Sequence, residues 1–164
     1  MPYRQVGLQR FSVTSSRPFA DVVAAVDAAI GHPDMAAFQR DIAAARTYAE
    51  AEQVTHRAVG PSNLMEFLRL DMGAFLRKAT GATTPRMLRL IVGNPLIMKQ
   101  MAEHVPDAGS YAPVTILIDE RADGVHLSYD RMASVLAPYG SPAALQVARD
   151  LDTKVEGLLL AAAA

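Results

Sequence analysis

The chain has 164 residues, of which 51% are hydrophobic, and this size and apolar content suit one folded domain rather than a disordered chain. Its 16 basic and 17 acidic side chains give a formal net charge of −1. The chain therefore lacks the excess of basic residues that is typical of nucleic-acid-binding proteins and of proteins held on anionic membranes. No cysteine is present, which excludes disulfides, thiolate nucleophiles and cysteine-ligated zinc or iron–sulfur sites.

The N-terminal segment predicts a strand followed by a helix. Residues 5–14 alternate in the manner of a β-strand, with a kink or bulge near residues 9–10. Pro18 suits a first helical turn, and apolar side chains then recur at helical spacing through residues 19–30. The Gly-His-Pro sequence at 31–33 is expected to end this helix.

Residues 34–60 predict a pair of helices. Asp34 can cap the first, while Thr47 and Glu50 have the Thr-x-x-Glu spacing of a capping box that starts the second. The second helix would end at Gly60, before a proline. Because the segment is rich in alanine and polar on one side, we expect the pair to lie on the surface of the domain.

Two further strands are predicted in the middle of the chain, at residues 64–72 and 87–92. Residues 73–79 between them predict either a short helix closed by Gly81 or a continuation of the strand, because periodicity does not decide so short a run.

The sharpest local signal follows the third strand, at Gly93-Asn94-Pro95. Asn94 is a favourable N-cap, and Pro95 suits the first helical position, so a short helix is expected over residues 96–104.

The C-terminal part predicts a hairpin and a final helix. Residues 114–119 and 125–129 alternate as strands on either side of an Asp-Gly turn at 123–124. Asp130 is expected to cap a short helical segment, and Ser141 is expected to start a final helix with apolar positions at helical spacing.

These elements predict an α+β fold, a two-layer sandwich with a curved, mainly antiparallel sheet of about five strands and helices packed mainly on one face. No internal repeat or low-complexity linker is visible, so residues 1–164 are expected to form a single domain.

Three stretches together resemble a known bacterial family. They are Leu-Ile-Val-Gly-Asn-Pro-Leu-Ile-Met at 90–98, Ala-Pro-Val-Thr-Ile-Leu-Ile-Asp-Glu at 112–120, and Val-His-Leu-Ser-Tyr-Asp at 125–130. Their order and spacing resemble the family called domain of unknown function 302, over about residues 5–155. The resemblance implies a compact α+β domain with a curved sheet, often paired as a homodimer, and implies no established activity.

The chain departs from the family pattern at three places. Asp71-Met72 stands where many members have Asp-His, and Asp130-Arg131-Met132 stands where many have Asn-x-Pro. Residues 34–60 are longer than in the shortest members, which implies a helical insertion there.

Ten residues at strand ends, in the Gly-Asn-Pro turn and its helix, and at two tyrosines are the candidate ligand-binding set: Asp71, Met72, Gly93, Asn94, Pro95, Met98, Lys99, Tyr111, Tyr129 and Asp130. A helix N-terminus such as that at Asn94 can hold an anion. Methionines line adaptable apolar cavities. The tyrosines can line a pocket in which Lys99 or Arg89 pairs with an anion.

Each of these features also has a purely structural interpretation. Capping alone accounts for the Gly-Asn-Pro turn, methionines fill irregular core space, and tyrosines cover core edges while their hydroxyls stay in water. No pair among the four histidines has the i, i+4 spacing of a helical zinc site. We therefore expect no metal centre and no cofactor.

Three functions remain open at this point. The first is a homodimeric binding or sensing domain with a cavity of about 300 Å³ or more for a small apolar or mixed-polarity ligand. The second is an enzyme that uses Asp71, His104 or Asp130 with Lys99, and it requires two of these side chains within hydrogen-bond reach. The third is a module that only pairs subunits.

The expected location is cytoplasmic. Residues 1–7 carry no apolar run of signal-peptide type, and the sequence has no stretch of about 18 apolar residues. Neither a membrane nor a nucleic acid is expected as a partner.

Overall fold

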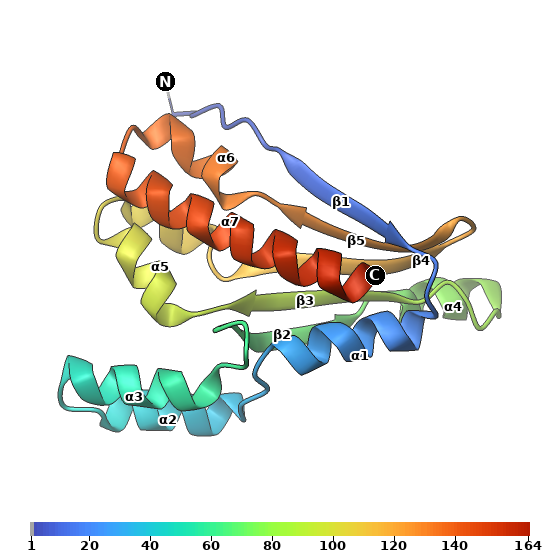
Figure 1. Cartoon of the computed structure of the whole chain (residues 1–164), viewed down its shortest axis with the longest axis horizontal. Coiled ribbons are helices and arrows are strands. Elements are labelled where there is room, and N and C mark those ends of the chain that lie inside the picture. Colours follow the sequence, from blue (N-terminus) through green and yellow to red (C-terminus); the bar gives the residue numbers. More distant parts are fainter. Residues whose placement is uncertain (1) are drawn as a thin grey trace.

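The structure is a computed structural model that describes residues 2–164, with five strands, seven α-helices and two short 3-10 turns in those residues (Figure 1). The strands are β1 (Arg10–Ser15), β2 (Met65–Asp71), β3 (Met87–Gly93), β4 (Val114–Arg121) and β5 (Gly124–Asp130). The helices are α1 (Phe19–Ala29), α2 (Met35–Ala44), α3 (Tyr48–Ala58), α4 (Gly73–Thr80), α5 (Pro95–Ala102), α6 (Met132–Leu136) and α7 (Pro142–Ala163). The 3-10 turns are Pro106–Ser110 and Ala137–Tyr139.

The five strands form one open sheet in the order β1-β5-β4-β3-β2, and every neighbouring pair is antiparallel. Strands β3 and β4 are adjacent even though α5 lies between them in sequence, so the connection doubles back rather than crossing over the sheet. The predicted α+β class and five-stranded antiparallel sheet are confirmed.

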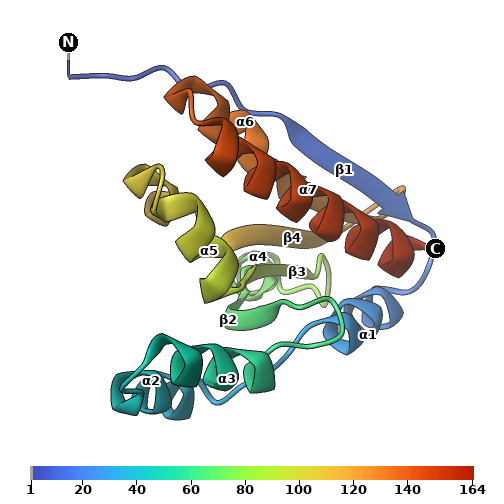
Figure 2. The same cartoon turned by 60° about the vertical axis from the view of Figure 1, so that its left-hand side comes forward.

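Alternation along the strands gives the sheet one buried face. Leu90 on β3, Ile116 on β4 and Leu127 on β5 are fully buried, whereas their sequence neighbours on the strands face the other side. Helix α7 lies across the buried face and contacts α1, α5, α6, β1 and β5 (Figures 1 and 2). The helices therefore pack mainly on one face, as predicted.

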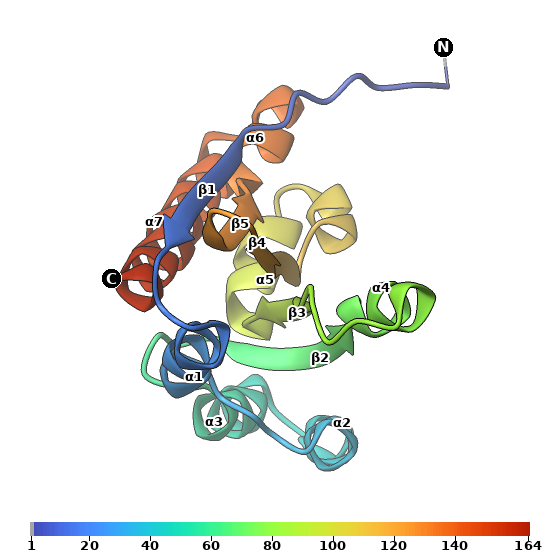
Figure 3. The same cartoon turned by 90° about the vertical axis from the view of Figure 1, so that its right-hand side faces the viewer.

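The other side of the sheet, which we call the outer face, is open over most of its area. Figure 3 views the sheet nearly along its strands and shows α7 and α1 on one side, with α4 projecting on the opposite side near β2 and β3. Side chains on this face such as those of Arg89, Thr115 and Leu117 are at least partly exposed to solvent.

Helix starts follow the local signals. Asp34 accepts a hydrogen bond from Ala37 N (2.8 Å), and Ser141 accepts one from Ala144 N (3.3 Å). Thr47 accepts one from Glu50 N (3.2 Å). In a capping box the Glu50 carboxylate would accept from the N–H of Thr47, but here it accepts from the N–H of Arg46, one residue earlier (2.6 Å). Helices α2 and α3 pack on each other and stand apart from the sheet (Figure 2).

The predicted start of the first strand was wrong, and the type of element at residues 73–80 was left open by the sequence. The first strand begins at Arg10, not at Gln5, because only residues from Arg10 onward pair with β5. Residues 73–80 form helix α4, which resolves the alternative left by periodicity. Gly81 closes this helix in the left-handed conformation (φ 70°), which favours glycine.

The predicted cap of α6 was also wrong. Asp130 does not cap that helix: strand alternation turns its side chain to the outer face, where it pairs with Arg10 (2.6 Å). The acceptor at the start of α6 comes instead from Asp152, which lies 20 residues further along the chain on α7.

Among the helices of residues 2–164, none combines the length and apolar character that crossing a membrane requires.

Candidate functional site

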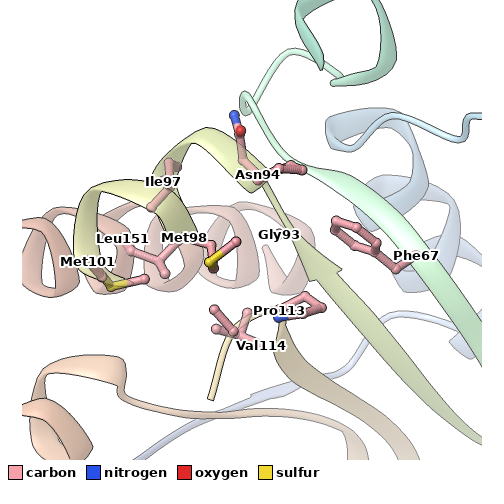
Figure 4. Close-up of a pocket in the computed structure, with 11 residues that line it drawn as sticks. Phe67, Gly93, Asn94, Ile97, Met98, Met101, Pro113, Val114 and Leu151 are labelled. Carbon is pink, nitrogen blue, oxygen red and sulfur yellow. The ribbon is translucent and has the colours of Figure 1, made fainter. Parts of the chain in front are cut away.

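A small cavity lies between α5, the start of β4, the bulge in β2 and the middle of α7 (Figure 4). Its volume is about 100 Å³. Its lining is almost wholly apolar and consists of Phe67, Gly93, Asn94, Pro95, Ile97, Met98, Met101, Ala112, Pro113, Val114 and Leu151. We call this space the α5 cavity.

The Gly-Asn-Pro turn forms one wall of the cavity. A Cβ added to Gly93 would lie 3.1 Å from Pro113 Cβ and 3.6 Å from the Phe67 ring, so the glycine allows β3 to approach both walls closely. Pro95 then takes the first position of α5, where a missing N–H costs nothing. The local sequence thus sets the position of the helix that carries the two methionines.

Asn94 is the only polar side chain in the lining, and both of its ends are already engaged. Its Oδ1 accepts a hydrogen bond from Leu96 N (2.9 Å), and its Nδ2 donates one to the carbonyl of Asn63 (2.9 Å). The side chain is also nearly buried. Capping therefore accounts for this residue, and the cavity offers no uncommitted polar side chain to a ligand.

Four of the ten candidate residues meet at this cavity: Gly93, Asn94, Pro95 and Met98. Sequence reasoning missed Phe67 and Leu151 as lining residues. Phe67 sits at a register shift between β2 and β3, and such a bulge redirects a side chain without leaving a sequence mark. Leu151 belongs to α7, and the packing of α7 next to α5 depends on the whole fold, so the sequence near Leu151 does not reveal that it lines the cavity.

Asp71, Met72 and Lys99 lie away from the cavity. The Asp71 carboxylate accepts from Ala74 N (3.0 Å) at the start of α4 and pairs with Arg77 (2.7 Å), whose hydrogen bond lowers the pKa of Asp71. Met72 is partly exposed just before α4. Lys99 pairs with Glu103 (2.6 Å), and that hydrogen bond raises the pKa of Lys99.

The two candidate tyrosines lie in different environments. The Tyr111 hydroxyl bonds that of Tyr139 (2.9 Å), which raises the pKa of Tyr139 to about 12. Tyr129 is buried, and its hydroxyl donates to Asp152 (2.8 Å). Burial, and then the negative charge of Asp152, raises the pKa of Tyr129 above its usual value.

Asp152 is a buried carboxylate whose role is structural. Its fully buried carboxylate accepts from the Tyr129 hydroxyl, from Met132 N (2.7 Å) and from Ala133 N (3.1 Å). These bonds join α7, β5 and the start of α6. No sequence signal marks this role, because Asp152 stands among other polar residues of a long amphipathic helix.

A second hollow, of about 200 Å³, lies on the outer face. Its lining includes two further candidate residues, Tyr129 and Asp130, together with Arg10, Arg89, Thr115, Leu117 and Ser128. The ten candidates are thus divided between two sites and several separate surface positions.

The side chains of the enzyme hypothesis are not brought together. Asp71, Lys99, His104 and Asp130 form no hydrogen bond or ion pair with one another within residues 2–164. Asp71 and Asp130 are each neutralised by an arginine, and Lys99 by Glu103. This geometry gives no support to acid–base chemistry by these groups.

One histidine does lie near two carboxylates. Ligand atoms of Asp27, His32 and Glu66 fall within 4.8 Å of one another. However, the guanidinium of Arg69 contacts both carboxylates, at 2.7 Å from Glu66 Oε2, and cancels one of their two negative charges. The cluster is an ion-pair network that ties α1 to β2.

The comparisons with known proteins agree with this fold. A family model described as "Domain of unknown function DUF302" matches residues 38–162. A solved structure described as an uncharacterized conserved protein DUF302 from Bacillus stearothermophilus is similar with a TM-score of 0.63, at 11% identity over 93% of this chain and 97% of that chain. At that identity the likeness shows the fold alone. None of the curated proteins compared with the chain matches it.

Proposed function

The chain belongs to the DUF302 family, and on that premise we propose that it is a homodimeric domain that binds a small apolar molecule, or the apolar end of a larger one, in the α5 cavity. The observation that carries the proposal is a space lined by apolar side chains whose single polar member, Asn94, already makes a hydrogen bond at each end of its amide. Desolvating such a space costs little, so apolar contact alone can favour a ligand.

The volume restricts the ligand. About 100 Å³ is well below the roughly 300 Å³ at which pockets for drug-sized ligands begin, and below the size expected from the sequence. An apolar protein cavity of about 150 Å³ can hold benzene. The ligand group is therefore about as large as one aromatic ring or one branched alkyl group.

The methionines give the cavity room to adapt. Met98 and Met101 reach it from successive turns of α5 (Figure 4). Their unbranched, polarizable side chains can change rotamer at low cost and make favourable contacts with an aromatic ring. A ring slightly larger than the resting space can therefore be accommodated without moving the backbone.

The homodimer is supported by exposed apolar side chains at one end of the molecule. Leu68, Met72, Phe75 and Leu76 are all large, apolar and solvent-exposed, and Phe75 is 82% exposed. They lie on β2, on α4 and at their junction. We call them the α4 patch. Three of the four fall within residues 72–76, and exposed apolar side chains that cluster in this way are a feature of protein-association sites.

The ligand proposal is tested with benzene as the probe, read by the methyl NMR signals of Met98 and Met101. We expect both signals to shift saturably. The Val114→Phe variant fills the cavity and should abolish the shifts, while Val114→Ala enlarges it and should keep or strengthen them.

The two variants control for each other, because each is expected to cost about 1–3 kcal/mol of stability at the same buried position. Equal benzene responses in both variants, or no saturable response in the unmodified protein, would disprove binding in the α5 cavity. Neither result depends on the oligomeric state.

A further inference from the structure

Arg89 differs from the other arginines in the strands of residues 2–164. Those three each pair with a carboxylate: Arg10 with Asp130, Arg69 with Glu66, and Arg121 with Asp119. Arg89 lies on β3, between β4 and β2 in the sheet, and has no acidic partner within those residues. Its sole hydrogen bond is a long one to the Thr115 hydroxyl (3.5 Å).

The strand register places this guanidinium beside uncommitted polar groups. Arg89 is directly opposite Leu117 on β4, and Leu117 is directly opposite Ser128 on β5, so the three side chains share the outer face. The Ser128 hydroxyl makes no hydrogen bond to another described residue. Together with Thr115, these groups line the hollow of about 200 Å³ on that face.

The charges at the hollow favour a singly charged anion. Arg10 and Asp130 form a close pair at its edge and cancel each other, which leaves the single positive charge of Arg89. The Asp130 carboxylate would also repel a second negative charge on a ligand. The electrostatic complement of this site is therefore a monoanion.

We propose that the outer-face hollow binds the carboxylate of a small organic acid, which Arg89 holds with its guanidinium while the hydroxyls of Thr115 and Ser128 donate hydrogen bonds to it. A planar carboxylate matches the two parallel N–H groups of an arginine. Leu117 provides an apolar surface for the carbon skeleton of the acid. This site is separate from the α5 cavity and does not rest on the function proposed for it.

The test is a titration with benzoate, followed by the backbone amide NMR signals of Thr115, Leu117 and Ser128. We expect saturable shifts with benzoate and none with benzamide, which has the same shape without the charge. Arg89→Met should weaken benzoate binding at least tenfold, and Arg89→Lys should weaken it less because it keeps the charge but loses the two-pronged contact.

Arg40→Met is the matched control, because Arg40 is also an exposed arginine, forms no ion pair with another residue of 2–164, and lies on α2. It should leave the benzoate response unchanged. An equal response to benzamide, an equal response in Arg89→Met, or loss of the response in Arg40→Met would overturn the proposal.

The carboxylate that Arg89 binds could instead belong to a second copy of the chain, and sedimentation velocity distinguishes that case from binding of a free acid. We expect Arg89→Met to sediment like the unmodified protein. If the substitution instead dissociates a dimer, the carboxylate belongs to the partner copy and the free-acid proposal fails. The methyl signals of Met98 and Met101 report the α5 cavity independently in the same samples.

Discussion

Two aspartates show how far a residue's role depends on what the fold brings to it. Asp130 stands at a strand end beside a helix, which is where a cap is expected, yet its side chain pairs with Arg10 on the outer face. Asp152 stands in the middle of α7 and supplies the acceptor for the start of α6. Both outcomes follow from which face of an element each side chain occupies.

Replacing Asp152 by alanine is expected to lower the free energy of unfolding by about 3–5 kcal/mol, because the Tyr129 hydroxyl and two backbone N–H groups lose their buried acceptor. Urea unfolding of the two proteins measures the difference. Asp150→Ala is the control on the same helix: Asp150 is exposed and, among the residues that the structure describes, its side chain bonds only Gln146, so its loss should cost less than about 0.5 kcal/mol. Equal unfolding midpoints for the two variants would contradict a buried structural role for Asp152.

Helix caps whose partners lie close by in the sequence could be predicted from the sequence. The caps at Asp34, Thr47, Asn94 and Ser141 were all predicted, and all four are confirmed, because a cap and its N–H partner lie within three residues of each other. The acceptor at α6 could not be found in this way, since its partner lies 20 residues away in sequence.

At the scale of elements, the connection from β3 to α5 does more than turn the chain. Asn94 caps α5 and also binds the carbonyl of Asn63 in the segment before β2, so one side chain fixes both the helix start and the neighbouring loop. The sequence predicted the cap but not the second bond. Element type was harder to predict in short segments: α4 has eight residues, and so short a run fits a helix or a strand.

Asn94→Ala is expected to cost about 2 kcal/mol of stability, because it removes an N-cap and leaves the Asn63 carbonyl without its partner. Ser141→Ala removes the cap of α7 alone and should cost about 1 kcal/mol. Chemical denaturation measures both values, and hydrogen exchange should show faster opening of α5 only in Asn94→Ala. A loss for Ser141→Ala as large as that for Asn94→Ala would show that the bond to Asn63 contributes nothing.

For the whole molecule, period-two alternation in the strands and 3.6-residue periodicity in the helices were enough to predict the fold class. Strand order and the α5 cavity were not predictable in this way. The order depends on long-range pairing, and the cavity depends on how Phe67, Met101 and Leu151 pack from three separate elements. That residues 34–60 form an insertion relative to the family stays a prediction, although the helices themselves are present.

The open outer face also bears on assembly. Helices α1 and α7 lie on one side of the sheet, and α4 projects on the other (Figure 3). The large side chains of the α4 patch are exposed to solvent. A stable pairing of two copies should bury about 1,000 Å² or more in total. A two-fold arrangement would bring the same patch of both copies together, so one substitution would alter both sides of the interface.

Phe75→Glu should therefore convert the proposed dimer to a monomer. The change places a charge at the most exposed large apolar side chain of the α4 patch on both copies, and the two charges would repel each other across a two-fold axis. The fold should survive, because Phe75 is 82% exposed within one chain, and circular dichroism can verify this. Sedimentation velocity measures the mass of the assembly.

Leu160→Glu is the matched control, because Leu160 is also a large exposed apolar side chain but lies on α7, away from α4. It should leave the dimer intact. A dimer that persists in Phe75→Glu would move the interface to another surface, and a monomer in the unmodified protein would refute pairing itself. Because the α5 cavity is lined by residues of a single chain, a monomeric result would leave the benzene experiment fully informative.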